Sequence, residues 1–132
     1  MNNIKALLGT LRIPFLILAP ACTVLGIASA GTTVQNIPAL DIVLVLLGAV
    51  LAHIGVNVFN EYQDFKTGLD TKTRRTPFSG GSGALQQRPD LANSALAIAA
   101  AATTLTAAIG IYFIFKQGFW LLPVGLVGLV LL

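Results

Sequence analysis

The chain has 132 residues, of which 55% are hydrophobic and only 10% are charged, with a formal net charge of +3 at pH 7. This composition excludes an ordinary soluble domain and is typical of an integral membrane protein. The small positive charge gives no reason to expect a nucleic-acid partner, because the basic residues flank apolar segments and are mixed with acidic ones.

Three uncharged intervals are each long enough to cross a bilayer, which takes about 20 helical residues. They lie at 13–40, 42–60 and 91–115. The predicted fold class is therefore an all-α integral membrane helical bundle with about four transmembrane helices. We expect these helices at about 11–30, at about 40–62, at about 91–115, and from Gly118 onward.

The two ends of the sequence carry further expectations. The first apolar run, which follows Lys5 and Arg12, is too long for a cleaved signal peptide, so we expect the first helix to be retained. The last apolar run, 118–132, has neither a polar cap nor a basic flank of the kind that ends a helix at the water interface. We therefore expect residues 1–132 to be a single membrane domain, truncated at its C-terminus.

The connections between the predicted helices differ in charge. The second, 63–90, is an acidic and basic loop, whereas the third, "KQG", is expected to be a tight turn. The excess of basic residues predicts that the N-terminus and the second loop are cytoplasmic, in a multi-pass protein of the cell (inner) membrane, with Lys116 as a single opposing charge. The basic residues of the second loop are Lys66, Lys72, Arg74, Arg75 and Arg88.

A polar stripe is predicted on one face of the second helix. Its residues follow one another at intervals of four, three and four, which gives one narrow line on a continuous helix. Polar groups at this depth are costly unless they face protein, water or a ligand. For His53 we favour a hydrogen bond across the bundle, and for Asp64 a functional role. The stripe consists of His53, Asn57, Asn60 and Asp64.

A second carboxylate, Asp70, follows the stripe. On an uninterrupted helix it would project about 120° away from Asp64, but Gly68 between them offers an easy helix break. The segment can thus bring Asn60, Asp64 and Asp70 around one point. Two carboxylates and an amide oxygen are hard ligands suited to Mg²⁺, which completes its shell with water and phosphate oxygens.

Four cations, Lys66, Lys72, Arg74 and Arg75, lie close in sequence to these carboxylates. Acidic and basic groups together indicate a metal-bridged polyanion such as a diphosphate. The open alternative is a solvated loop whose basic residues only set the membrane topology. The adjoining "TPFSGGSGAL" lacks the Gly-Lys-Ser/Thr of a P-loop and is either a flexible lid or a nest of backbone N–H groups for an anion.

The segment "NEYQDFKTGLD" resembles the first Asp-rich motif of the UbiA superfamily of intramembrane aromatic prenyltransferases, Asn-Asp-x-x-Asp with a further Asp downstream. Glu61 in place of the second-position Asp and the longer gap to Asp70 are most similar to the menaquinone branch, which prenylates 1,4-dihydroxy-2-naphthoate. A weaker similarity is "LRIPFL" near the N-terminus. Members of the family form bundles of about nine helices with a second Asp-rich motif, and nothing after Asp90 matches that second motif.

The resemblance implies Mg²⁺-dependent transfer of a polyprenyl group from prenyl diphosphate to an aromatic acceptor, with this chain supplying the first Asp-rich half of the site. It implies that Asp64 and Asp70 are metal ligands and that Asn60 is a supporting ligand. The residues implied to bind the diphosphate are Lys66, Lys72, Arg74, Arg75 and Arg12.

Two other classes of function remain open on the residues alone. In a small transporter or channel subunit the polar stripe would line a pore, although the third helix offers only hydroxyl groups to complete it. In a noncatalytic membrane scaffold the basic loop would bind anionic lipid.

Overall fold

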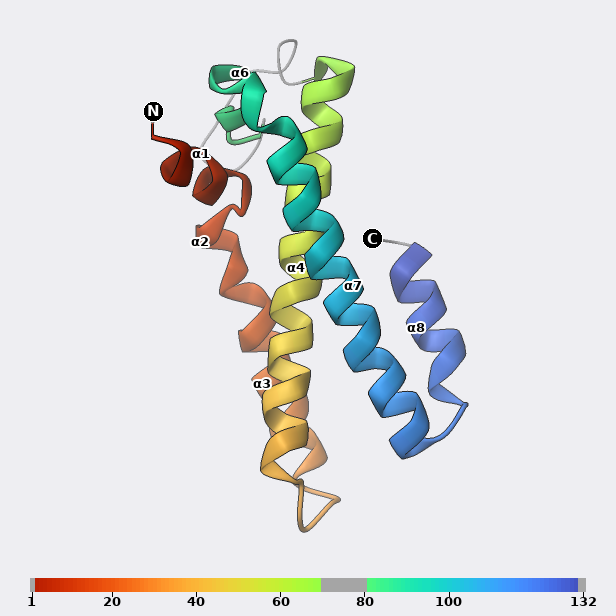
Figure 1. The fold of residues 1–132 in the computed structure, drawn as a ribbon. Helices are drawn as coiled ribbons and strands as arrows, with labels where there is room; N and C mark the ends of the chain where they lie inside the picture. Colours follow the sequence, from red (N-terminus) through yellow and green to blue (C-terminus); the bar gives the residue numbers. More distant parts are fainter. Residues whose placement is uncertain (1, 70–80, 131–132) are drawn as a thin grey trace.

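The computed structural model describes residues 2–69 and 81–130, and within these ranges every regular element is helical. Three stretches are long and apolar enough to cross a membrane, Ile13–Ala30, Ala39–Thr67 and Pro89–Gln117, and a shorter apolar helix follows at Leu121–Val130. The predicted all-α membrane bundle is thus confirmed. In chain order (Figure 1) the helices are α1 (Asn3–Thr10), α2 (Ile13–Leu16), α3 (Leu18–Ala30), α4 (Ala39–Thr67), α6 (Ala84–Gln87), the 3₁₀ helix η1 (Pro89–Leu91), α7 (Ala92–Gln117) and α8 (Leu121–Val130).

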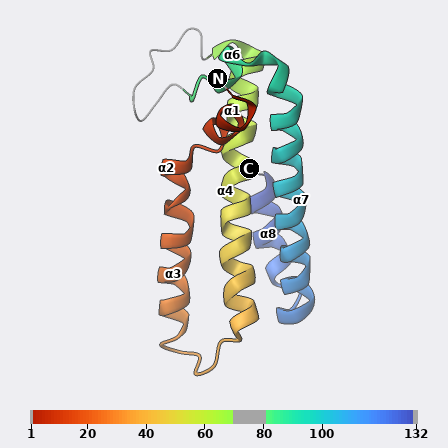
Figure 2. The same cartoon turned by 60° about the vertical axis from the view of Figure 1, so that its left-hand side comes forward.

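The longest helix, α4, is the axis of the arrangement. Helix α7 runs along one side of it and α3 along another, while α8 turns back beside α7 (Figures 1 and 2). The short helices α1 and α6 lie together at the end of the bundle that contains the C-terminal turns of α4. This end therefore gathers segments from three separate parts of the sequence.

The first predicted helix, expected at about 11–30, is broken at its start. Arg12 has φ 53° and ψ 52°, a left-handed conformation that no α-helix continues through, and Pro14 stands in the first turn of α2. The residues before the break form α1, which was not predicted and which the Asn2 side chain caps at the Ile4 N–H. The break allows α1 to leave the direction of α2 and α3 (Figure 2).

Helix α4 is longer than predicted at its C-terminal end. It continues past residue 62 to Thr67, because no glycine or proline interrupts these turns. In addition, the positive charge of Lys66 in the last turn stabilises the negative end of the helix dipole. Gly68 then ends the helix with φ 69°, so the helix break expected at this glycine is confirmed. The segment 63–90, expected to be a loop, accordingly contains the last turn of α4 as well as α6 and most of η1.

A glycine-to-alanine substitution tests this helix end. We expect Gly68→Ala to lower the free energy of unfolding by about 1 kcal/mol, because an L side chain is strained at a positive φ. The control is Gly26→Ala in α3, where an added Cβ meets no atom within 4 Å and a helix interior gains from alanine. The free energies of unfolding of both variants are measured by SDS titration in mixed micelles. Equal effects of the two substitutions would contradict the assigned conformation of Gly68.

Small side chains bring α4 and α7 together. On α7 the buried residues are all alanines, at intervals of three and four, which is one face of a helix. Gly48 on α4 is buried as well, and a Cβ there would lie 3.4 Å from the side chain of Ile109. The small side chains thus allow the two helices to approach closely. The buried cluster at the α1 and α6 end consists of Ala6, Val58, Leu85, Leu91, Ala95 and Ala99.

An ion pair joins α4 and α7 at the opposite end. Asp41, 7% exposed in the first turn of α4, lies 2.5 Å from the Nζ of Lys116 in the last turn of α7. Each charge also has the sign that its own helix end favours, negative at the N-terminus of α4 and positive at the C-terminus of α7. Lys116, which opposes the predicted charge bias, thus has an acidic partner. Since Lys116 and Gln117 belong to α7, the turn predicted at "KQG" begins only at Gly118, with φ 114°.

Candidate functional site

The polar stripe lies on one uninterrupted helix, α4, as its spacing requires. His53, Asn57 and Asp64 are each partly buried, and Asn60 is exposed. Asn60 is therefore the most exposed member of the stripe, in the C-terminal part of α4.

The middle of the stripe has a structural partner. The Asn57 Nδ2 donates a hydrogen bond to the carbonyl oxygen of Leu11 at 3.0 Å. This carbonyl directly precedes the left-handed Arg12, where the helical hydrogen-bond pattern is interrupted. Asn57 thus satisfies a backbone group of the break, a need that is strict in an apolar environment. For His53, the hydrogen bond that we expected is not found within ranges 2–69 and 81–130.

Glu61, next to Asn60 on α4, turns into the protein and is 2% exposed. Its Oε1 accepts a hydrogen bond from the Ser82 N–H at 2.6 Å, and its Oε2 accepts one from the Ser82 Oγ at 2.8 Å. The Nε of Arg12 lies 4.0 Å from Oε1. The backbone N–H and the hydroxyl of Ser82, in the glycine-rich segment, therefore bind a carboxylate of the protein itself.

Arg12, which the resemblance implied as a diphosphate-binding residue, lies near the C-terminal end of α4. Its guanidinium stacks over the Phe15 ring at 4.9 Å from the centroid, and its side chain remains 27% exposed. The stacking restricts the guanidinium without using all its hydrogen-bond donors. Its role toward a diphosphate stays a prediction.

The predicted metal ligands are only partly within the described residues. Asn60 and Asp64 are one turn apart on α4 and offer amide and carboxylate oxygens, a donor type that suits Mg²⁺. Lys66, also exposed, has its Nζ 5.6 Å from the centroid of the Tyr62 ring. Within 2–69 and 81–130, no three His, Cys, Asp or Glu side chains cluster as a metal site. The predicted residues that lie outside the described ranges are Asp70, Lys72, Arg74 and Arg75.

A second polar contact secures the same end of the bundle. Arg88 donates hydrogen bonds to both carboxylate oxygens of Asp90, at 2.9 and 2.6 Å, and one to the Asn3 Oδ1 at 2.8 Å. The hydrogen bond with Asp90 raises the pKa of Arg88. Arg88 therefore connects the start of α1 with η1 and is engaged in a structural contact.

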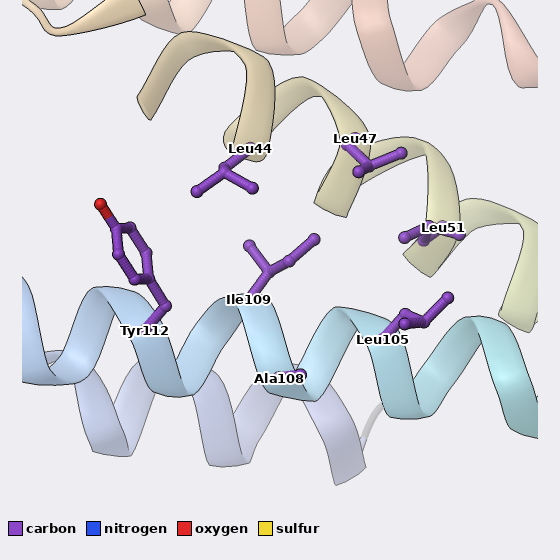
Figure 3. Close-up of a pocket in the computed structure, with 7 residues that line it drawn as sticks. All are labelled: Leu44, Leu47, Leu51, Leu105, Ala108, Ile109 and Tyr112. Atoms are coloured by element: carbon purple, nitrogen blue, oxygen red, sulfur yellow. The ribbon is translucent and has the colours of Figure 1, made fainter. Parts of the chain in front are cut away.

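Away from the acidic motif, an apolar hollow of about 430 Å³ opens between α4 and α7. Figure 3 shows leucines of α4 facing side chains of α7 across it. The lining offers no charged group, so the hollow suits hydrocarbon and not a polar solute. It is lined by Leu44, Leu47, Leu51, Leu105, Ala108, Ile109 and Tyr112.

Part of this chain matches a known prenyltransferase. Over 84 residues it is 33% identical to 1,4-dihydroxy-2-naphthoate octaprenyltransferase of Bacillus subtilis (strain 168). Any continuous stretch of that length in this chain includes residues 49–84, so the match covers the acidic motif. It spans 64% of this chain but only 26% of the relative. No family model and no solved structure matches.

Reasoning from the sequence missed the burial of Glu61, which is the most deeply buried acidic residue of the motif within the described residues up to 69. Glu61 was noted only as a replacement for aspartate, and Ser82 only as part of a glycine-rich segment. An available signal was the pairing of a glutamate inside an apolar helix with a serine between two glycines. The distance of 21 positions between them concealed it.

Proposed function

We propose that this chain supplies the first Asp-rich half of the site of a Mg²⁺-dependent membrane prenyltransferase of the UbiA type. The reaction transfers a polyprenyl group from prenyl diphosphate to an aromatic acceptor. The observation that carries the proposal is the match to an octaprenyltransferase across the acidic motif. By the same similarity, the proposed acceptor is 1,4-dihydroxy-2-naphthoate and the proposed pathway is menaquinone biosynthesis.

The proposed Mg²⁺ ligands are Asp64 and Asp70, with Asn60 as a supporting ligand. The exposed and partly exposed oxygens of Asn60 and Asp64 at the end of α4 suit such a role. When bound, the metal would neutralise negative charge on the departing diphosphate. The carboxylates alone would repel that group.

Two of the proposed diphosphate-binding cations lie within the described residues. Arg12 and Lys66 are both near the C-terminal turns of α4, and each retains exposure. Their charge-assisted hydrogen bonds to phosphate oxygens would orient the C1–O bond that breaks. Three further cations of the segment are assigned to the same task from the sequence, namely Lys72, Arg74 and Arg75.

The proposed chemistry exchanges one bond of the prenyl group for another. The C1–O bond of the allylic diphosphate breaks, and its electron pair leaves with the diphosphate. The carbon then bonds to the electron-rich ring carbon that bears the carboxylate, and loss of this carboxylate as carbon dioxide returns the electron pair that restores aromaticity. Apolar helix walls keep water from the cationic carbon. In the proposed orientation the acidic loop faces the cytoplasm, as the basic residues favour.

The proposal is tested with the complete reading frame that contains this chain, purified in detergent. Dihydroxynaphthoate and prenyl diphosphates of several lengths are supplied with Mg²⁺. We expect a prenylated product that disappears with EDTA and returns on addition of Mg²⁺. Transfer that is indifferent to EDTA, or no transfer to any aromatic acceptor, would contradict the proposal. Solute flux through vesicles without transfer would instead favour the transporter alternative.

The 132 residues alone are expected to be inactive. A single acidic motif holds part of the metal and diphosphate clamp, and catalysis requires the whole clamp in position. The purified chain, free of any other chain, is assayed under the same conditions. Product formation above the level of a buffer blank would contradict this expectation.

A further inference from the structure

The carboxylate of Glu61 is an unusual feature of the helix end. It is 2% exposed in a helix that is otherwise largely apolar. A charge that loses its water costs several kcal/mol unless hydrogen bonds and an opposite charge replace that water. Glu61 has both, from Ser82 and from Arg12. Ser82 and Arg12 therefore form a binding site for the Glu61 side chain.

The Ser82 side of this binding site depends on a backbone turn at two glycines. Gly81 and Gly83 both have φ 68°, which places Ser82 between two left-handed glycines. The Ser82 Oγ also accepts a hydrogen bond from the Ala84 N–H at 3.1 Å, in the first turn of α6. One serine thus joins the carboxylate on α4 to the start of α6.

The α1 side of this binding site is the helix break at Arg12. Asn57 and Glu61, one turn apart on α4, hold its two sides, the Leu11 carbonyl and the Arg12 side chain. Helix α1 approaches closely, since a Cβ on Gly9 would lie 3.3 Å from the Ala84 Cβ. The Glu61 carboxylate on α4 therefore lies between the helix break that follows α1 and the serine that precedes α6.

We propose that Glu61 is a positioning residue, whose carboxylate fastens both Ser82 and Arg12 to α4 beside Asn60 and Asp64. The contact fixes the point at which the chain after residue 80 joins the bundle, and it fixes the side from which Arg12 is presented. Its effect on diphosphate binding rests on the proposed function. The fastening of α6 to α4 does not.

The first test measures the structure and not the activity. Spin labels are attached at two exposed positions, Gln63→Cys on α4 and Gln87→Cys on α6, in the 132-residue chain in lipid nanodiscs, with Cys22→Ser as background. We expect a narrow distribution of label distances that Glu61→Gln broadens, because the amide N–H₂ faces donors. The matched control is Thr67→Val, an exposed position on the same helix, which should leave the distribution unchanged.

Ser82→Ala provides an independent variant, since it removes the two hydrogen bonds of the Oγ, one to Glu61 and one from the Ala84 N–H, and no charge. It retains the backbone N–H of residue 82, so we expect a smaller broadening in the same direction. If Glu61→Gln does not fold, this variant decides the question. Distributions that stay narrow in the folded variants would overturn the proposal.

The second test uses the complete reading frame and its prenyl transfer. Loss of the Glu61 contact should raise the KM for prenyl diphosphate by about tenfold, the low end for residues that orient a ligand-binding group. The KM for the aromatic acceptor should not change, because the contact acts through Arg12. If Glu61→Gln broadens the label distances but the complete reading frame shows no prenyl transfer, the positioning role stands and the proposed function is rejected. Lost transfer with unchanged label distances would show that Glu61 acts directly at the site, contrary to our proposal.

Discussion

Asp64→Asn, made in the complete reading frame, is expected to lower prenyl transfer by more than about 100-fold. The substitution keeps the shape of the side chain and removes the negative charge that a divalent cation requires. Asp64 is partly exposed, one turn after Asn60 on α4, and its proposed role is that of a Mg²⁺ ligand. The rate is measured at saturating prenyl diphosphate, over a range of Mg²⁺ concentrations.

The control for this substitution is Asp90→Asn. Asp90 is an exposed aspartate at the same end of the bundle, and its carboxylate is engaged with Arg88 in a salt bridge. An exposed pair of this kind is worth at most about 1 kcal/mol, so transfer should stay within a few-fold of the unmodified protein. If Asp90→Asn were as damaging as Asp64→Asn, or if Asp64→Asn retained full transfer, the assigned metal ligand would be wrong.

Ala99→Leu should destabilise the bundle by about 1–3 kcal/mol, the usual effect of adding methylenes to a packed core. Ala99 is completely buried in the cluster that includes Val58 of α4. A leucine there must push α7 away from α4, since the backbones have no room for it. The free energy of unfolding is measured by SDS titration of the 132-residue chain in detergent.

The same helix provides a matched comparison in Ala101→Leu. Ala101 is exposed on the face of α7 that would contact lipid. The added side chain there meets no packed neighbour, and we expect a change below about 0.5 kcal/mol. Equal destabilisation by the two substitutions would contradict the packing of α7 against α4.

Much of the fold was accessible from the sequence because long uncharged intervals admit few alternatives in a bilayer. The second and third spans follow directly from the charges at Asp41, Glu61 and Lys116 that bound them. The break at Arg12 could not be predicted from the sequence, since arginine has no local preference for a left-handed conformation. It depends on contacts from α4, where Asn57 and Glu61 hold its two sides.

The candidate site divides in the same way. The stripe that ends in Asp64 is a local pattern of one helix, so its spacing alone predicted a shared face. The burial of Glu61 required knowledge of Ser82, which comes 21 positions later and reaches it only through two left-handed glycines. Long-range polar contacts of this type leave no periodic signal. Glu61 is consequently buried, whereas Asp64, in the same motif, is partly exposed.

The continuity of α4 has a consequence for the depth of the site. The rise from Asp41 to Asp64 along this helix is about 35 Å at ~1.5 Å per residue. This length slightly exceeds the hydrocarbon thickness of a bilayer, about 30 Å. With Asp41 at one boundary, Asp64 reaches the plane of the lipid phosphates on the other side. A substrate with a diphosphate head and an apolar tail would then meet Asp64 by lateral diffusion, its tail still immersed among the acyl chains.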